Sequence, residues 1–403
     1  MPSLRNWRKK RVTKSDDKKV PALRFKGFTD DWEQRKFESL IYPEKIKNKN
    51  NLQLPAYSIS NKNGFIAQTD QFGKDNTYSK TDKKTNYIVN PGAFAYNPAR
   101  INVGSIGYQN LATPVLVSSL YEVFKTNSQI NDLFLIYWFK TDKFFNQIKK
   151  YEEGGVRQYY FLDKLLFSEI IIPKDAREQQ KISKILKKLD YLFSLQQRKL
   201  RYLSAIKKSL LQNMLVDNDL RPELRFTKFS GNWEQHKISE MAKRLDNLRI
   251  PVTASNRKKG DIPYYGANGI QDYVEGFTHK GENILIAEDG ANNLDNYPIR
   301  LVKGKIWVNN HAHVLKAYKN CTDIQFLEFE LKKLNIYKYL VGGSRLKLNA
   351  DILMNISIKS PTLKEQKKIG FMLSLLEENT IFQQRKLNKL ELLNQFFLQH
   401  MFI

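Results

Sequence analysis

Two short segments come near to catalytic motifs but lack residues that the chemistry needs. Asn97-Pro-Ala-Arg100 approaches the Asn/Asp-Pro-Pro-Tyr/Phe loop with which adenine methyltransferases hold a flipped base, but it has neither the second proline nor the aromatic ring. The segment from Gly276 to Glu282 has the glycine spacing of a phosphate-binding loop without its Gly-Lys-Ser/Thr ending. The sequence therefore predicts neither methyl transfer nor nucleotide hydrolysis.

Two other segments contain possible ligands for a metal ion. Glu288-Asp289 precedes Gly290, but the lysine of an acidic-x-Lys nuclease arrangement does not follow. His311 and His313 can place two rings on one side of a strand, yet no cysteine or acidic cluster near them in the sequence completes a metal site. We expect no metal on this chain. The histidines should make surface or groove contacts, and Glu288 should lie in a turn or accept a hydrogen bond from a cytosine edge.

The composition indicates a partner with many negative charges. Lysine and arginine outnumber aspartate and glutamate by 67 to 41, and the formal net charge of +26 creates a field that attracts a polyanion. Nucleic acid is the first candidate and an anionic membrane surface the second. The sequence shows no run of about 18 apolar residues and no signal peptide, so we expect a cytoplasmic protein. The single cysteine, Cys321, excludes an internal disulfide and is expected to be a buried structural thiol.

Two copies of one unit follow each other along the chain. Pro21 to Lys36 matches Pro222 to Lys237 at Leu, Arg, Phe, Phe, Trp, Glu, Gln and Lys, with one constant offset. The offset shrinks from 201 residues at this start to 187 at the end of the copies, because the second copy is shorter in its middle. The closing matches are Glu178-Gln179 with Glu365-Gln366, and Gln196 to Leu200 with Gln383 to Leu387.

The middles of the two copies diverge, but short landmarks recur in them. Pro55-Ala-Tyr57 resembles Pro263-Tyr-Tyr265, and each precedes an Asn-Gly turn, at Asn63-Gly64 and Asn268-Gly269. Gly154 to Arg157 is matched by Gly342 to Arg345, which places an arginine on a glycine-rich loop twice. Each middle should be mixed α and β. Strands are expected at Tyr87–Val89, Val115–Val117, Glu169–Ile172, Ile284–Ala287, Ile306–Val308 and Asn355–Ile358, and helical spacing covers Asp132–Lys150 and Asp323–Tyr339.

A long helix is expected at the end of each copy. Asp175 with Glu178, and Thr362 with Glu365, form starts that resemble capping boxes. Apolar residues then recur every seven positions, as in the seam of a coiled coil. These positions are Ile182, Leu189, Leu203 and Leu210 in the first helix, and Ile369, Leu376, Leu390 and Phe397 in the second.

A glutamine occupies the same seam position in both helices, at Gln196 and Gln383. A polar residue in an apolar seam costs stability and fixes the register. We therefore expect the two glutamines to pair and to hold the two halves at a set spacing. Helices of about 40 residues, roughly 60 Å each, are most economically packed on each other, although separate dimerisation with other chains stays open.

The two copies have similar ends and unlike middles, and each copy finishes with a long helix. From Pro21 onward this arrangement resembles the specificity subunit of type I restriction-modification enzymes. Tyr87 to Gly107 and Asn309 to Val314 also look like segments of that family. The resemblance implies an α+β fold with two mixed α/β target recognition domains in tandem. They would be separated and followed by long helices that pack as an intramolecular antiparallel coiled coil with pseudo-two-fold symmetry.

The resemblance also implies a division of the chain and of the work. Each target recognition domain would read one half of a bipartite, asymmetric DNA target, and the subunit itself would not be catalytic. Two methyltransferase subunits would dock on the helices, restriction subunits would join them, and these partners would use S-adenosylmethionine, ATP and Mg. The expected divisions are 1–20 (a basic, disordered tail), 21–173 (first recognition domain), 174–216 (first spacer helix), 217–360 (second recognition domain) and 361–403 (second spacer helix).

Polar residues in the landmark loops are the candidate DNA contacts. Arginine can grip guanine, and asparagine can grip adenine, through two hydrogen bonds in the major groove. The candidates are Ser60, Asn61, Lys62, Asn63, Asn97, Arg100, Asn102 and Arg157 in the first copy, and Tyr265, Asn268, Glu288, Asn292, His311 and Arg345 in the second.

Other functions remain compatible with parts of this pattern. A basic coiled-coil scaffold or an RNA-binding protein would explain the charge and the helices, but not the duplicated frames around unlike middles. A specificity subunit that serves a type II-like methyltransferase system would explain both.

Overall fold

The computed structural model describes residues 19–61, 64–72, 83–151, 159–216, 219–343 and 345–403. Its contacts divide the chain into two compact units. The first unit is Met1–Leu195 together with Leu387–Ile403, and the second is Gln196–Lys386. Most of the expected basic tail, 1–18, lies outside the described residues. Within them, no helix is both long enough and apolar enough to span a membrane.

The first unit is built on small antiparallel sheets. One sheet has the order β2-β10-β7-β8, a second has the order β3-β6-β9, and the hairpin β4-β5 packs against β8. Its helices are α1 (Gln68–Phe72), α2 (Asp132–Trp138), α3 (Asp142–Tyr151) and α4 (Leu162–Phe167). Its strands are β1 (Glu33–Lys36), β2 (Ile41–Pro43), β3 (Ile46–Lys47), β4 (Tyr57–Ser60), β5 (Gly64–Ala67), β6 (Tyr87–Val89), β7 (Phe94–Tyr96), β8 (Ile106–Tyr108), β9 (Val115–Val117), β10 (Glu122–Thr126) and β11 (Glu169–Ile172).

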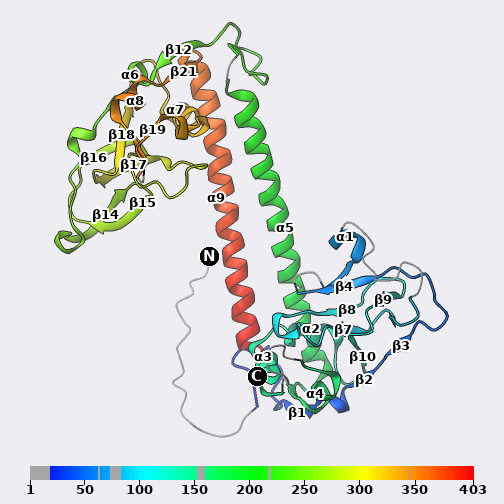
Figure 1. Ribbon diagram of the computed structural model, residues 1–403. Helices are drawn as coiled ribbons and strands as arrows, with labels where there is room; N and C mark the ends of the chain where they lie inside the picture. Colours follow the sequence, from blue (N-terminus) through cyan, green and yellow to red (C-terminus); the bar gives the residue numbers. More distant parts are fainter. Residues whose placement is uncertain (1–18, 62–63, 73–82, 152–158, 217–218, 344) are drawn as a thin grey trace. The chain divides into compact units, whose positions relative to one another are not determined.

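The second unit contains one larger sheet, in the order β13-β18-β16-β17-β14-β15, with α7 packed on it (Figure 1). Its short helices are α6 (Ile238–Met241), α7 (Ile324–Lys333) and α8 (Ala350–Asn355). Its strands are β12 (Glu234–Lys237), β13 (Ala242–Arg244), β14 (Lys259–Gly266), β15 (Gly269–Val274), β16 (His279–Ala287), β17 (Ile299–Val308), β18 (Ala312–Ala317), β19 (Leu340–Val341), β20 (Lys347–Leu348) and β21 (Ser357–Ser360).

The two sheets share a topology that their sequences do not reveal. The order β2-β10-β7-β8 in the first unit corresponds to β13-β18-β16-β17 in the second, and every neighbouring pair is antiparallel in both. The units differ in what is added to this core. In the second unit the hairpin β14-β15 joins the sheet through a parallel pairing of β14 with β17, whereas β4-β5 forms a separate sheet.

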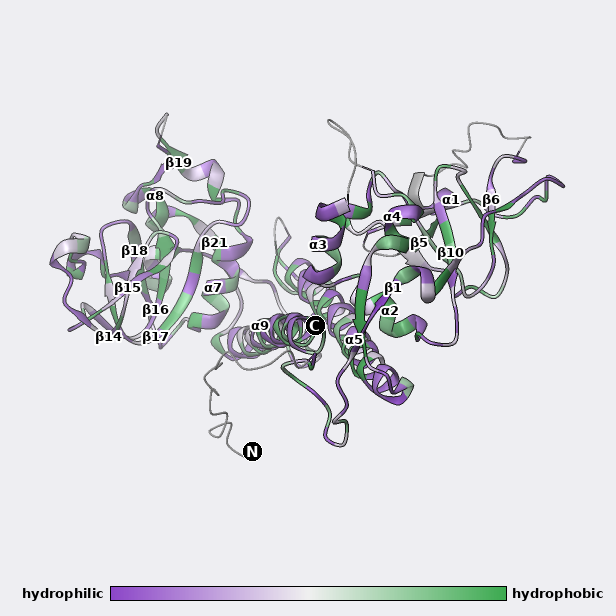
Figure 2. Cartoon of the chain, turned by 90° about the horizontal axis from the view of Figure 1, so that it is seen from below, coloured by the Kyte–Doolittle hydropathy of each residue, from purple (hydrophilic) through white to green (hydrophobic). Residues whose placement is uncertain are grey.

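The long helices α5 (Ala176–Met214) and α9 (Leu363–His400) contribute to both units. In the first unit, Leu186 near the start of α5 shares a core with Phe397 near the end of α9. In the second unit, Leu210 near the end of α5 shares a core with Leu373 near the start of α9. This is the order of an antiparallel pair, as the sequence predicts. Both helices carry hydrophilic as well as hydrophobic residues (Figure 2).

The repeated Arg and Glu form the same ion pair in each unit. Arg24 contacts Glu178 with Nε–Oε1 and Nη2–Oε2 distances of 2.7 and 2.8 Å. Arg225 contacts Glu365 in the same two-point manner, at 2.8 Å for both contacts. Both carboxylates are buried. The expected capping box is present only in part: Asp175 Oδ1 accepts from the backbone N–H of Arg177 at the start of α5, but both glutamates contact a distant arginine instead of the start of their own helix.

The repeated Trp and Gln complete this arrangement. Trp32 packs edge-on against Phe134 with ring centroids 6.0 Å apart, and Trp233 packs likewise against Phe326 at 5.7 Å. Gln179 Oε1 accepts a hydrogen bond from the backbone N–H of Asn131, just before α2. Gln366 does the same for Asp323, just before α7. We call these residues the frame: Arg24, Trp32, Glu178 and Gln179 in the first unit, and Arg225, Trp233, Glu365 and Gln366 in the second.

The end of each long helix also repeats, in a way that the sequence comparison missed. The backbone N–H of Leu23 donates to the carbonyl of His400 at 2.8 Å, and that of Leu224 donates to the carbonyl of Asn213 at 2.8 Å. Met401 and Met214, the residues that follow His400 and Asn213, are both buried. Each unit thus combines the start of one long helix with the end of the other.

Three local expectations need correction. Cys321 is exposed, with its Sγ near the carbonyl oxygens of Glu240 and Tyr318, so it is not a buried thiol. The helical stretches 132–150 and 323–339 each contain a break, since α2 is followed by α3, and α7 by a 3-10 turn at Ile336–Tyr339. The amide pairing of Gln196 with Gln383 is absent, because both Oε1 atoms are buried without any hydrogen-bond partner in the described part of the chain.

Candidate nucleic-acid interface

Asp289 is the centre of the candidate site in the second unit. It lies in the loop after β16, where its Oδ1 is 2.7 Å from His311 Nδ1 and 3.0 Å from Arg345 Nη2. The side chains of His311 and Arg345 are 38% and 61% exposed. With Nδ1 turned to a carboxylate, the proton of a neutral ring lies on Nδ1, and Nε2 is left as an acceptor. The site therefore offers an imidazole and a guanidinium that one carboxylate holds together.

The β14-β15 turn is tied to the same loop. Asn268 Nδ2 donates to the carbonyl of Gly290 at 2.9 Å, and its Oδ1 accepts from the backbone N–H of Asn292 at 2.9 Å. Four predicted residues from separate parts of the sequence thus come together: Asn268, Asn292, His311 and Arg345. Asn268 uses both ends of its amide within the protein, so it positions the loop. Asn292 contributes its backbone to this contact and has an exposed side chain.

A network of buried charges lies next to this loop. Glu288, which is 9% exposed, forms ion pairs with Arg249 at 2.6 Å and with Lys347 at 2.8 Å. Burial raises the pKa of Glu288, but hydrogen bonds from Lys347 and Arg249 outweigh it, and the pKa lies below its usual value. Burial likewise raises the pKa of Asp246, but its hydrogen bond with His313, 2.6 Å long, lowers the pKa below the ordinary range.

This network corrects the expectation that no acidic group lies near the histidines. Atoms of Asp246, Glu288 and His313 that could ligate a metal all lie within 4.8 Å of one another. The guanidinium of Arg249 is already 2.6 Å from Glu288 and 3.7 Å from Asp246. Arg249 thus already neutralises these carboxylates, which is what a bound metal ion would otherwise do. We interpret the network as the support of the exposed loop.

Burial also changes the interpretation of two candidate readers. Tyr265 is 8% exposed and belongs to a core cluster with Val308, and burial raises the pKa of its phenol. Glu288 is held among cations, as described above. Neither side chain is presented to a groove, so the prediction that they contact bases is not supported. The alternation of side chains along β14 directs Tyr265 into the core. Glu288 is enclosed by Arg249 and Lys347, which are distant from it in the sequence.

The candidate site of the first unit is a turn between β7 and β8. Asn97 Oδ1 accepts from the backbone N–H of Ala99 at 3.0 Å, so its amide shapes the turn. Arg100 and Asn102 follow on the same turn and are exposed. Asn61, also exposed, lies near Gly104, since its Cβ is 3.8 Å from the place where a side chain of Gly104 would begin. We therefore treat Asn61, Arg100 and Asn102 as the polar group at this turn.

The other first-unit candidates are less informative. Ser60 ends β4 and is half-buried. Lys62, Asn63 and Arg157 lie outside the described residues.

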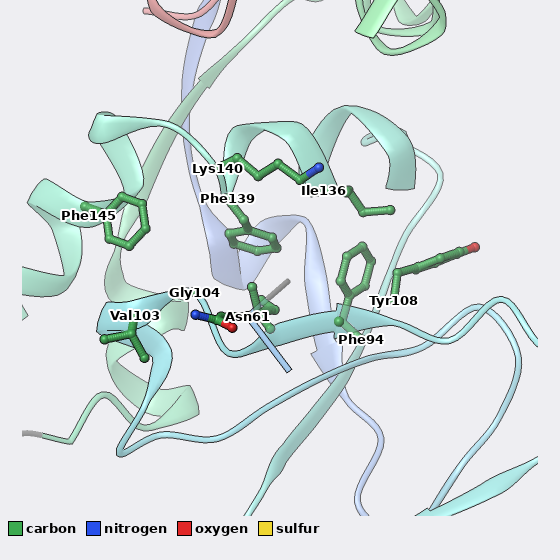
Figure 3. Close-up of a pocket in the computed structure, with 11 residues that line it drawn as sticks. Asn61, Phe94, Val103, Gly104, Tyr108, Ile136, Phe139, Lys140 and Phe145 are labelled. Atoms are coloured by element: carbon green, nitrogen blue, oxygen red, sulfur yellow. The ribbon is translucent and has the colours of Figure 1, made fainter. Parts of the chain in front are cut away.

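An apolar cavity of about 260 Å³ opens beside this polar group. Figure 3 shows the rings of Phe94, Phe139 and Phe145 around it, with Asn61 and Lys140 at its edges. The aromatic walls come from β7, α3 and the end of α2. The candidate surface of the first unit thus combines amides and an arginine with an apolar hollow, whereas that of the second unit is organised by a carboxylate.

Comparison with known proteins places the chain in a family. It belongs to the family of the type I restriction modification DNA specificity domain, whose model matches residues 29–205 and 230–392, once in each copy. Subunits of this family recognise DNA and are not catalytic. A type I restriction enzyme specificity subunit of Haemophilus influenzae is 45% identical over 143 residues, which cover 36% of this chain and 37% of the relative.

A solved structure shows the same fold. The chain is similar to the crystal structure of a type I restriction-modification system S subunit from M. genitalium, with a TM-score of 0.69 and 15% identity over 95% of this chain and 99% of that one. The HsdS subunit from Thermoanaerobacter tengcongensis aligns over 92% of this chain and 96% of its own, at 14% identity and a TM-score of 0.43.

Proposed function

We propose that this chain reads a bipartite, asymmetric DNA sequence for a type I restriction-modification enzyme, with one half-site read by the middle of each copy. The observation that carries the proposal is that two frames of equivalent geometry hold two different surfaces. Arg24–Glu178 and Arg225–Glu365 are equivalent contacts. The residues that each frame presents, around Asn61 and around Asp289, have no such equivalence.

Different surfaces imply different half-sites. Exposed asparagine and arginine side chains, as at Asn102 and Arg100, suit the edges of adenine and guanine. His311 can offer an acceptor to an exocyclic amino group through Nε2 while Asp289 holds Nδ1. Arg345 is more than half exposed and can contact a base or a phosphate. Base contacts specify the sequence and phosphate contacts fix the position, and the excess of positive charge supports the latter.

The long helices support the docking of partners. Large apolar side chains are exposed along them, which is unfavourable unless another protein covers them. Examples are Tyr191, Tyr202 and Ile206 on α5, and Phe371, Phe382 and Leu392 on α9. We assign this surface to two methyltransferase subunits, with restriction subunits added to them. These partners would methylate adenine with S-adenosylmethionine and cleave DNA with ATP and Mg, in the cytoplasm.

Genome-wide mapping of methylated adenine tests the proposal. A host without related systems receives the methyltransferase gene with or without the gene for this chain. We expect an interrupted motif with two different halves to become methylated only when both genes are present. Absence of any new interrupted motif would overturn the proposal. Binding by the assembled complex should also weaken steeply between low and moderate salt, because cations on the protein replace counterions of the phosphates.

A further inference from the structure

In the β14-β15 hairpin of the second unit, the side-chain amide of Gln271 packs against the backbone at Gly266. A Cβ on Gly266 would lie 2.3 Å from Gln271 Nε2 and 2.7 Å from its Cδ, so the amide occupies the space that a side chain at Gly266 would need. Gln271 Oε1 faces Arg257 Nη2 and Asn309 Nδ2, each at 3.5 Å. The residue as a whole is exposed. The amide is thus oriented by its neighbours, with Oε1 toward Arg257 and Asn309 and Nε2 over Gly266.

The guanidinium of Arg300 packs against Gly269, the second glycine of the same hairpin. A Cβ on Gly269, where φ is +125°, would be 2.9 Å from Arg300 Nη1 and 3.2 Å from both Cζ and Nη2. Arg300 Nη2 reaches the carbonyl of Asn268 at 3.3 Å. Among the described residues no carboxylate lies within ion-pair distance of Arg300, whereas Arg249 has two and Arg257 has one. Its positive charge is therefore not neutralised by the protein in the described part of the chain.

These two planar groups have the properties of base readers. A fixed side chain loses little conformational freedom when it binds, and fixed geometry favours one hydrogen-bonding pattern over others. Glutamine presents a donor and an acceptor that match adenine N7 and N6, and arginine presents two donors that match guanine O6 and N7. The hairpin is also tied through Asn268 to the loop that carries Asp289. Gln271 and Arg300 therefore belong to the same surface as His311 and Arg345.

We propose that Gln271 and Arg300 are specificity-determining residues, which read an adenine and a guanine in the half-site of the second copy. The proposal rests on the proposed function and deepens it. Gly266 acts as a positioning residue, because the space it leaves fixes the Gln271 amide.

Three variants of the complete methyltransferase complex test this assignment. Gln271→Ala removes the amide. Gly266→Ala keeps the amide but displaces it, and the displaced atoms are the mobile end of a side chain. Arg300→Lys keeps the charge but loses the two-point geometry. Lys305→Gln is the matched control, because Lys305 is an exposed cation on the same strand as Arg300. The readouts are the methylated motif and the competition between cognate duplexes and duplexes with single substitutions.

We expect each of the three variants to lose preference at one position of one half-site, by roughly ten- to a hundredfold. Gln271→Ala and Gly266→Ala should affect the same position, and Arg300→Lys a different one. The other half-site should stay unchanged, which shows that the protein is folded. Lys305→Gln should weaken binding to all sequences equally.

The outcomes separate this inference from the proposed function. If the wild-type complex methylates no interrupted motif, the proposed function fails. If the motif exists and the Gln271 and Arg300 variants read it unchanged, only this inference fails. A loss of binding that is equal for all sequences would also overturn it, because that result marks a phosphate contact or a structural role.

Discussion

The frame and the surfaces that it carries differ in how closely the second copy reproduces the first. In the frame, Arg24 and Glu178 have counterparts in Arg225 and Glu365 that make the same two contacts. In the surfaces, the two copies share an Asn-Gly dipeptide in sequence, but the turn that contains Arg100 has no counterpart of Asp289. The difference teaches that a constant support can hold surfaces of different chemistry, so that each surface can change without losing its attachment to the helices.

The largest effect is expected where the two units are most alike. Glu178→Gln and Glu365→Gln each leave a largely buried arginine without its charge partner, so each should lower the free energy of unfolding of its own unit by about 3–5 kcal/mol. Hydrogen exchange resolved along the sequence can measure the two units separately. Glu38→Gln, in an exposed ion pair with Lys36, is the control and should change stability by less than about 1 kcal/mol. A large loss in one unit alone would contradict the equivalence of the frames.

The ionisable groups of the two units predict opposite responses to pH. In the second unit, burial raises the pKa of Glu377, but the charges of Lys332 and Lys207 outweigh it and lower the pKa below its ordinary value, as happens for Glu288 and Asp246. Carboxylates with lowered pKa stabilise the fold above their unfolded values of 4.5 and 3.8, and this stability is lost as the pH falls below them. Asp323, whose pKa is raised by burial, opposes this in part.

In the first unit the main groups are tyrosines. Burial raises the pKa of Tyr108 to about 12, and it also raises the pKa of Tyr96, Tyr137 and Tyr160. A raised pKa stabilises the fold below the unfolded value of 10, and this stability is lost as the pH rises toward the folded value. The loss is about 1 kcal/mol per fully buried tyrosine for each pH unit above 10.

Acid should therefore open the second unit first, and alkali the first unit. Hydrogen exchange after brief exposure to pH 3.5 and pH 11 would follow peptides of each unit, with pH 7 as the reference. In the second unit Tyr297 and Tyr265 also have raised pKa values, so its alkaline loss should be smaller but not zero. The same order of opening at both extremes would contradict this prediction.

A smaller effect separates the two frame tryptophans. Trp32 Nε1 donates to Glu178 at 3.3 Å, whereas Trp233 Nε1 is buried with no partner in the described part of the chain. Trp32→Phe and Trp233→Phe remove similar volumes, but only the first removes a hydrogen bond. We expect Trp32→Phe to be more destabilising by about 1 kcal/mol, measured by denaturant unfolding of each variant. Equal losses would indicate that packing alone decides the contribution of this position.

The sequence predicted the repeat and the helices better than it predicted the contacts that join them. The sequence suggests a capping-box role for Glu178, because its partner, Arg24, lies far away in the chain and only the fold brings the two together. The frame residues are recognisable by their repetition, but repetition does not say which residue touches which.

The candidate site shows the same limit. Asn268 was found because Asn-Gly marks a turn, yet that role occupies its amide with the loop at Gly290. Gln271 and Arg300 were missed, since their significance comes from two glycines beneath them and from no motif. Arg249 was missed as well, because a cation that neutralises Glu288 from 39 residues away leaves no local pattern.

An effect of similar size concerns the glutamines that both helices share. The Oε1 atoms of Gln196 and Gln383 are buried without partners, and an unsatisfied buried acceptor is costly. Gln383→Leu should therefore raise the free energy of unfolding of the second unit by about 1 kcal/mol. The exposed neighbour Gln197→Leu is the control and should have little effect.

If the glutamines set the helix register, the gap of the methylated motif should lose its single length in Gln196→Leu or Gln383→Leu complexes, since an apolar seam permits more than one alignment. The opposite result is a variant that is more stable while its complex still methylates motifs with a single gap length. That result would show that the frame residues at the ends of the helices set the spacing, and that the seam does not.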